Sequence, residues 1–291
     1  MKKYIYLLGT LLALNACKKE SRPENEGEFT ILTYNIAGLP QGFNDDQFPV
    51  KHTPLISPLI NDYDIVQVQE DFCYHDKLLQ GDKHPYRTVT SGCVPFGSGL
   101  NTLSNFPILG INRASWSACT GADCLTPKGF TYSKIKLSND VVIDCYNLHA
   151  NAGKSDESFE ARKVGFVQLM NFINNNSTGN AIIICSDFNS RYTRPQDTLE
   201  IFLNNGFEDT WLELVRNDSV PAFGDDLRNC DIGVNNFDCE KLDKIFYKNN
   251  DKIQLTPISI SLDDARYYDN EGMPLSDHEP VVVKFKFKLI E

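Results

Sequence analysis

The sequence predicts an α/β sandwich in which two packed β-sheets carry helices on their outer faces. Two observations support this fold class. Five short apolar runs are rich in β-branched residues, and several of them are apolar at both strand parities, as is typical of strands covered on both faces. Helical segments and long irregular stretches separate these runs, which favours layers of sheet and helix around one core.

The expected strands lie, in chain order, at 29–34, 64–69, 141–146, 181–185 and 280–287. The last alternates Val283, Phe285 and Phe287 with lysines, so we expect one of its faces to be exposed. Helices are expected over 53–61, 158–174 and 195–204, the second of which places apolar side chains at helical spacing. The stretch 91–128 is rich in loop residues, and we expect substrate contacts there.

The first sixteen residues are expected to be an export signal, because Lys2 and Lys3 precede an apolar run that ends at Leu14. The run is shorter than the roughly 20 residues of a membrane-spanning helix. It ends in Leu-Asn-Ala-Cys17, which resembles a bacterial lipobox with an acylated cysteine; the alternative is an ordinary signal peptide and a chance cysteine. We therefore predict a signal peptide at 1–16, an acylated Cys17 with a polar tether at 17–28, and one globular domain at 29–291, exported to the bacterial cell envelope.

The net charge indicates which binding partners are disfavoured, and the number of cysteines indicates an oxidising compartment. The formal net charge of −11 becomes −13 when Lys2 and Lys3 leave with the signal, and such a body repels a polyanion unless a basic patch or bound cations intervene. Eight of the nine cysteines remain beside Cys17, so disulfides are expected in an oxidising compartment. Loop context favours Cys119 with Cys124 and Cys230 with Cys239, then Cys73 with Cys93, whereas Cys145 and Cys185 lie in apolar strands as buried thiols.

Polar side chains follow the predicted strands at their C-terminal edges. Strand ends that converge on one rim are where a sheet protein builds a site. Asn35 follows the first strand, Glu70 the second, His149 the third, Asp187 and Asn189 the fourth, and Asp277 and His278 precede the fifth.

Two of these residues suit a magnesium ion. Mg²⁺ prefers hard oxygen ligands and typically binds one or two carboxylates together with waters and a substrate phosphate, so Glu70 can hold it with few protein partners. Asn35 could orient that carboxylate or a metal-bound water. We expect Mg²⁺ as the cofactor, with Mn²⁺ or Ca²⁺ as alternatives.

The remaining residues suit hydrolysis of a phosphate ester. A water nucleophile needs a base whose pKa is near neutral, which fits His278, and Asp243 could fix the tautomer of that base. Asp187 and Asn189 would position the attacking water and the phosphoryl oxygens. His149 could donate a hydrogen bond to a non-bridging oxygen as charge builds on it.

Six short motifs, in this order, resemble the endonuclease/exonuclease/phosphatase superfamily. They are Thr33-Tyr-Asn35, Gln67-Val-Gln-Glu70, Asn147-Leu-His149, Ser186-Asp-Phe-Asn189, Leu242-Asp243 and Ser276-Asp-His278. The resemblance implies a four-layer, DNase I-like α/β sandwich, a divalent metal on Glu70 and a base, His278, paired with Asp243. Asp277 either lies near the metal or holds its loop, and we count it as a candidate metal ligand. Ser186 stands where these enzymes usually have glycine.

Within this superfamily the chain resembles the secreted sphingomyelinase-like branch. The segment Pro127-Lys128-Gly129-Phe130 before a strand resembles an element of those enzymes, although the sequence has no large aromatic hairpin for membrane insertion. Lys128 is therefore a candidate substrate ligand, and Asn147 is another because it shares strand parity with His149. The alternatives are that Lys128 is a solvated cation and that Asn147 bonds only to backbone.

These observations favour a lipid-anchored, Mg²⁺-dependent phosphodiesterase that hydrolyses a phospholipid headgroup, sphingomyelin-like, with a water activated by His278. An anchor at Cys17 would hold the enzyme beside a membrane substrate. One alternative is an extracellular DNase-like endonuclease, which would need a basic strip for nucleic acid. A phosphatase acting on inositol phosphates and a non-catalytic lipoprotein that binds a phosphorylated ligand are further alternatives. No protein partner is inferred.

Overall fold

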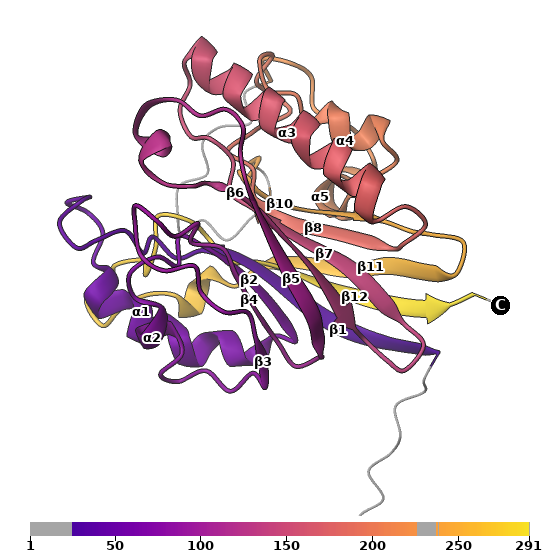
Figure 1. The fold of residues 1–291 in the computed structure, drawn as a ribbon, viewed down its shortest axis with the longest axis horizontal. Coiled ribbons are helices and arrows are strands. Elements are labelled where there is room, and N and C mark those ends of the chain that lie inside the picture. The colour runs from indigo at the N-terminus through magenta and orange to yellow at the C-terminus, as the bar shows by residue number, and fades with distance from the viewer. Residues whose placement is uncertain (1–24, 226–236, 238, 291) are drawn as a thin grey trace, which may run out of the picture.

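The computed structural model describes residues 25–225, 237 and 239–290, and these residues form two six-stranded sheets packed face to face (Figure 1). The first sheet contains, in spatial order, β11 (Ile253–Leu262), β12 (Val281–Leu289), β1 (Glu26–Asn35), β2 (Ile65–Gln69), β4 (Asn101–Ser104) and β3 (Tyr86–Arg87). The second contains β5 (Ile108–Ser115), β6 (Gly129–Lys136), β7 (Val142–Leu148), β8 (Ile182–Asp187), β10 (Asp243–Lys248) and β9 (Glu208–Asp209).

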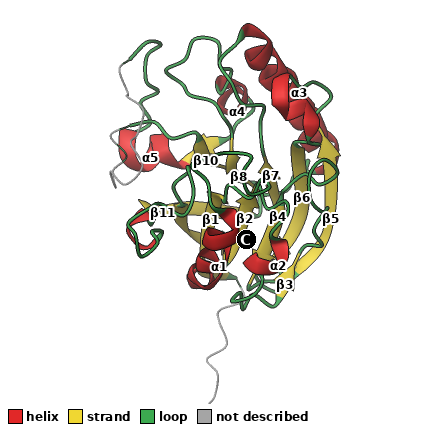
Figure 2. Cartoon of the chain, turned by 90° about the vertical axis from the view of Figure 1, so that its left-hand side faces the viewer, coloured by secondary structure: helices red, strands yellow, loops and turns green. Residues whose placement is uncertain are grey.

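Helices cover the outer face of each sheet, as Figure 2 shows from a second direction. On the side of the first sheet lie α1 (Pro49–Leu59) and α2 (His75–Leu78), and on the side of the second lie α3 (Asp156–Asn176), α4 (Glu200–Asn204) and α5 (Thr210–Arg216). Short 3₁₀ turns occur at η1 (Ile60–Asp62), η2 (Gly121–Leu125) and η3 (Asp264–Arg266). The four layers confirm the predicted α/β sandwich.

Three apolar cores hold these layers together and explain the strand composition. In β1, Ile31 points into the core between the sheets, and its neighbour Leu32 points into the core below α1. In β8, Ile183 faces the other sheet, whereas Ile184 packs in the core that contains Phe166 of α3. All of β8 and the second half of β1 are buried on both faces, so apolar side chains occur there at both parities.

The five predicted strands are confirmed as β1, β2, β7, β8 and β12. In β12, Phe285 and Phe287 are buried while Lys286 and Lys288 are exposed, which confirms the half-exposed pattern. The stretch 91–128 is less irregular than expected, because it contains β4, β5 and η2. Most residues of β5 are partly or fully exposed at the edge of its sheet, and an exposed edge strand lacks the apolar run on which the prediction depended.

Two of the three predicted helices are confirmed. The helix expected over 158–174 is α3, whose N-cap Ser155 accepts a hydrogen bond from the backbone N–H of Ser158. The helix expected over 53–61 begins earlier, at Pro49. The helix expected over 195–204 is wrong in extent, since only α4 is helical there. Asp197 instead accepts hydrogen bonds from Arg162 and from the backbone N–H of Arg191, and these hold the segment before α4 as a loop.

The cysteines follow the expectation where the structure describes them. Disulfides join Cys73 with Cys93 and Cys119 with Cys124, while Cys145 and Cys185 are buried free thiols. Cys230, the expected partner of Cys239, lies outside the described residues, as do the signal at 1–16 and Cys17, so the expectations for them stay predictions. Among the residues that are described, no helix is both long and apolar enough to cross a bilayer.

Candidate active site

The predicted catalytic side chains meet at one end of the sandwich, where strands of both sheets terminate. Asn35 ends β1 and Glu70 follows β2 in the first sheet, while Asp187 ends β8 in the second. Asp187 lies between two neighbours in its sheet, because it forms a bridge with His149 on one side and pairs in register with Asp243 on the other. The site is therefore built across the interface of the two sheets.

His278 and Asp243 form the expected pair. Nδ1 of His278 lies 2.7 Å from Oδ2 of Asp243, and its Nε2 lies 3.7 Å from Oδ2 of Asp187. Ser276 shapes the preceding turn, because its hydroxyl donates to the carbonyl of Asn35 at 2.6 Å and accepts from the backbone N–H of His278 at 3.2 Å. Burial lowers the pKa of His278, but Asp243 and Asp187 outweigh burial and raise the pKa above its ordinary value.

Asp187 is the central carboxylate of the site. Its Oδ2 lies 3.3 Å from Nε2 of His149 and accepts hydrogen bonds from the amides of Asn35 and Asn189, each at 3.3 Å. Burial raises the pKa of Asp187, but the charges of His278, His149 and Lys128 outweigh burial, so the pKa lies well below the usual range. Asp187 is thus a buried carboxylate surrounded by basic side chains and amide donors.

Glu70 is held by an unusual backbone. Its φ of 57° lies in the left-handed region, where a glutamate is uncommon, and Asn189 shares this region with a φ of 50°. Gly38 makes the turn possible, because a Cβ there would lie 2.3 Å from the carbonyl oxygen of Glu70. The Glu70 carboxylate accepts from Nδ2 of Asn35 at 3.2 Å and is 18 % exposed. Strained backbone of this kind clusters at functional sites.

The oxygen atoms of the site fit a divalent cation. Asn35 and Glu70 lie together as predicted, and ligand atoms of Asp187, Asp243 and His278 all lie within 4.8 Å of one another. Oδ1 of Asp243 is buried and has no hydrogen-bond partner among the described residues, which is costly unless a cation or water reaches it. This donor set is rich in carboxylate oxygen, the ligand type that Mg²⁺ prefers.

Asp277, the third candidate metal ligand, lies differently. It is exposed, and its Oδ1 accepts a hydrogen bond from the Ser276 hydroxyl at 3.4 Å. This contact corresponds to the alternative in which Asp277 holds its loop.

The two candidate substrate ligands occupy different settings. Asn147 is fully buried, where its amide donates to the carbonyls of Val68 and Asn101 and accepts from Gln69 at 2.8 Å, so it ties the two sheets together below the site. We therefore assign Asn147 to the backbone-bonding alternative. Lys128 is buried rather than solvated, and its Nζ lies 3.0 Å from Nε2 of His149.

Asp123 is a site residue that sequence reasoning missed. Its carboxylate lies 2.7 Å from Nζ of Lys128 and also accepts from the backbone N–H of Ala152 at 2.5 Å. The one signal in the sequence is the closeness of Asp123 to Cys119 and Cys124, whose disulfide folds the loop back toward Lys128.

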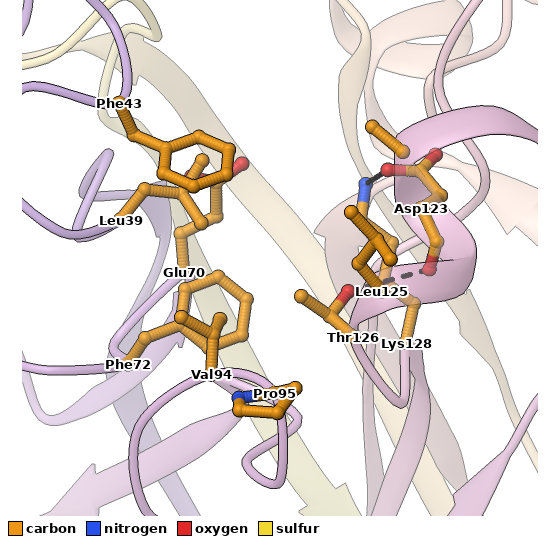
Figure 3. Close-up of a pocket in the computed structure, with 11 residues that line it drawn as sticks. Leu39, Phe43, Glu70, Phe72, Val94, Pro95, Asp123, Leu125, Thr126 and Lys128 are labelled. Atoms are coloured by element: carbon orange, nitrogen blue, oxygen red, sulfur yellow. Dashed lines mark hydrogen bonds and ion pairs between the residues drawn. The ribbon is translucent and has the colours of Figure 1, made fainter.

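A pocket of about 360 Å³ opens beside Glu70 and Lys128. Figure 3 shows two facing walls, of which one is mainly apolar and the other carries the Asp123–Lys128 pair. The first wall contains Leu39, Phe43, Glu70, Phe72, Val94 and Pro95, and the second contains Asp123, Leu125, Thr126 and Lys128. Ala122 also lines the pocket. A ligand that fits this pocket combines an apolar part with a charged group that reaches Glu70 and Lys128.

Comparisons with known proteins agree with this geometry. Residues 52–238 match the model of endonuclease/exonuclease/phosphatase family 2. A sphingomyelinase of Mycobacterium tuberculosis is 38 % identical over 270 residues, which cover 90 % of this chain and 53 % of the relative, so the chain spans about half the length of that relative.

Two solved structures share the fold. A beta toxin mutant of Staphylococcus aureus with bound magnesium ions superimposes with a TM-score of 0.63 at 20 % identity, over 88 % of this chain and 99 % of that one. Sphingomyelinase C of Streptomyces griseocarneus gives a TM-score of 0.63 at 18 % identity, over 89 % and 99 %. At this level of identity, the likeness concerns the fold.

Proposed function

Because the chain belongs to the endonuclease/exonuclease/phosphatase family, we propose that it is a metal-dependent phosphodiesterase acting on the headgroup of a sphingomyelin-like phospholipid. The observation that carries the proposal is the His278–Asp243 pair, which lies 2.7 Å apart beside a buried carboxylate and near an apolar pocket. The mycobacterial relative, a sphingomyelinase, supports the substrate class.

In this reaction His278 is the base. Asp243 accepts the Nδ1–H, so Nε2 is free to accept a proton from the attacking water. The raised pKa makes His278 a strong proton acceptor, and a divalent cation near the carboxylates would bring that pKa down toward neutrality. Asp187 and Asn189 orient the water, and His149 and Lys128 stabilise the charge that develops on a phosphoryl oxygen.

Glu70 and Asn35 would hold the cation, for which we propose Mg²⁺, with Mn²⁺ and Ca²⁺ as alternatives. When bound, this ion neutralises charge on the phosphoryl oxygens during in-line displacement. The chain's own contribution is the strained turn at Glu70, which fixes the direction of the carboxylate before substrate arrives.

A lipid substrate is favoured over nucleic acid by the pocket. Leu39, Phe43 and Phe72 offer apolar contact next to the charged residues, as an amphipathic ligand requires. Nucleic acid, by contrast, is a polyanion and is repelled by a chain whose formal net charge is −11. We also propose that the domain is exported and anchored at the cell envelope through Cys17, which the lipobox-like tetrad supports.

The test is hydrolysis of sphingomyelin vesicles and of duplex DNA by the chain from Lys18 onward, each with Mg²⁺ and with chelator. We expect chelator-sensitive release of phosphocholine, no DNA cleavage, and complete loss of turnover in His278→Ala. His84→Gln is the matched control, because His84 forms a similar pair with Asp82 at 2.5 Å and is not among the residues of the site. DNA cleavage without lipid cleavage would assign the nuclease alternative, and a fully active His278→Ala protein would refute the mechanism.

A further inference from the structure

Three loops around the pocket expose large apolar side chains. Phe43, in the loop after β1, is 61 % exposed; Phe96, in the loop before β4, is 84 % exposed; and Leu125, before β6, is 63 % exposed. Phe43 and Leu125 stand on opposite walls of the pocket, and Phe96 follows the wall residue Pro95 (Figure 3). The pocket thus opens between apolar projections from both of its walls.

Disulfides and a backbone hydrogen bond constrain the second and third of these loops. The Cys73–Cys93 disulfide anchors the second loop, and the backbone N–H of Phe96 donates to the carbonyl of Cys93 at 3.1 Å. The Cys119–Cys124 disulfide closes the third loop directly before Leu125. Exposed apolar groups on a braced support gain free energy when a partner removes them from water.

The charge of the same loops indicates which surface they fit. Loops 36–48, 88–100 and 116–128 contain Asp45, Asp46 and Asp123 but Lys128 as their one cation, and Lys128 is paired with Asp123. An anionic bilayer attracts basic segments and repels acidic ones. A zwitterionic bilayer carries no net charge, so it does not repel these acidic loops, and their apolar side chains can insert into it.

We propose that Phe43, Phe96 and Leu125 form a docking surface that inserts into the interface of a zwitterionic lipid bilayer and places the pocket over it. The proposal rests on the proposed function, since the docked bilayer supplies the substrate. Each of the three loops contributes one side chain to this surface.

Binding to vesicles that contain no sphingomyelin tests the surface independently of turnover. The chain from Lys18 onward serves for this experiment, because all three apolar cores are built from residues after Glu28. We expect it to sediment with phosphatidylcholine vesicles, and we expect Phe96→Ser to weaken binding roughly tenfold by removing one inserted side chain. Val167→Ser on α3, which also removes an exposed apolar side chain, should leave binding unchanged. Adding phosphatidylglycerol to the vesicles should weaken binding.

A soluble choline phosphodiester separates docking from catalysis. Phe96 does not line the pocket, so Phe96→Ser should cleave this substrate at the normal rate while losing activity on vesicles. Binding to phosphatidylcholine vesicles without cleavage of any phosphodiester would retain the docking surface and overturn the proposed function. The docking surface would be overturned if the protein cleaves the soluble substrate but Phe96→Ser, Phe43→Ser and Leu125→Ser each bind vesicles as well as the unmodified protein does. Tighter binding to anionic vesicles than to zwitterionic ones would also overturn it.

Discussion

A buried ion pair links the two chain segments that carry Asp243 and His278. Nζ of Lys241 contacts Oε2 of Glu279, and both side chains are buried. Lys241 stands two residues before Asp243, and Glu279 directly follows His278, so the ion pair joins the two chain segments that carry the base and its partner. Oε1 of Glu279 is buried without a hydrogen-bond partner among the described residues. Loss of the lysine would leave this carboxylate in an apolar setting with its charge uncompensated.

We therefore expect Lys241→Met to lower the free energy of unfolding by about 3–5 kcal/mol, the usual cost of breaking a buried pair from one side. The double variant Lys241→Met, Glu279→Leu removes both charges and should recover most of that loss. Lys284→Met is the matched control, because its partner Glu28 and Lys284 itself are half-exposed, and such a pair contributes about 0–1 kcal/mol. Urea unfolding at constant m-value measures all three.

The catalytic readout is kcat on a soluble phosphodiester. Lys241→Met should lower kcat and leave KM nearly unchanged, because the ion pair positions His278 and does not touch the substrate. The reasoning is refuted if Lys241→Met costs no more stability than Lys284→Met. It is also refuted if the double variant is as unstable as the single one, since the penalty would then not come from the unpaired charge.

Three further predictions concern the metal, the pH and the turn at Glu70. Mg²⁺ at a hundredfold excess over its Kd should stabilise the protein by about 2.7 kcal/mol in thermal unfolding, and Glu70→Gln should abolish this gain. Burial raises the pKa of Glu240, but Lys244 and the backbone N–H groups that donate to Glu240 outweigh burial, so the pKa of Glu240 is lowered. The ionised Glu240 therefore stabilises the folded state above the unfolded-state pKa of about 4.3, and this stabilisation is lost as the pH falls. The free energy of unfolding should then fall more steeply below about pH 5 in the native protein than in Glu240→Gln; equal slopes would contradict this. Gly38→Ala should destabilise the protein by about 1–3 kcal/mol and weaken Mg²⁺ binding, because the new Cβ would press on the Glu70 carbonyl; isothermal titration checks the second effect.

Buried strands and site residues in short motifs could be predicted from the sequence, whereas the exposed edge strand could not. Strand β8 and the second half of β1 are buried on both faces, and this burial favours consecutive apolar residues such as Ile31 and Ile183, so composition alone locates these strands. Edge strand β5 carries no such constraint and was missed. The candidate site residues stand at strand ends in recognisable short motifs, which is why the sequence could predict that Glu70, Asp187 and His278 lie together.

Residues whose role depends on a distant partner could not be identified in this way. Asp123 becomes part of the site only because its loop brings it to Lys128, and Lys241 finds Glu279 across 38 positions of sequence. Asn147 shares a motif with His149 yet turns its amide to the other sheet. Sequence spacing specifies which face of a strand a side chain occupies, but it does not specify which segment covers that face.

The direction of β1 bears on where an anchored enzyme can work. The strand runs for ten residues from Glu26 to Asn35, a distance of about 30 Å, and Asn35 contacts Glu70, which lines the pocket. The chain therefore enters the domain at the end of β1 that lies away from the pocket. If Cys17 is acylated, residues 18–24 can span at most about 25 Å between the anchor and the domain. This span is shorter than β1 itself, and the mouth of the pocket would point away from the leaflet that carries the anchor. The enzyme would then act in trans, on a facing membrane or on passing vesicles, and would spare the lipids of its own cell.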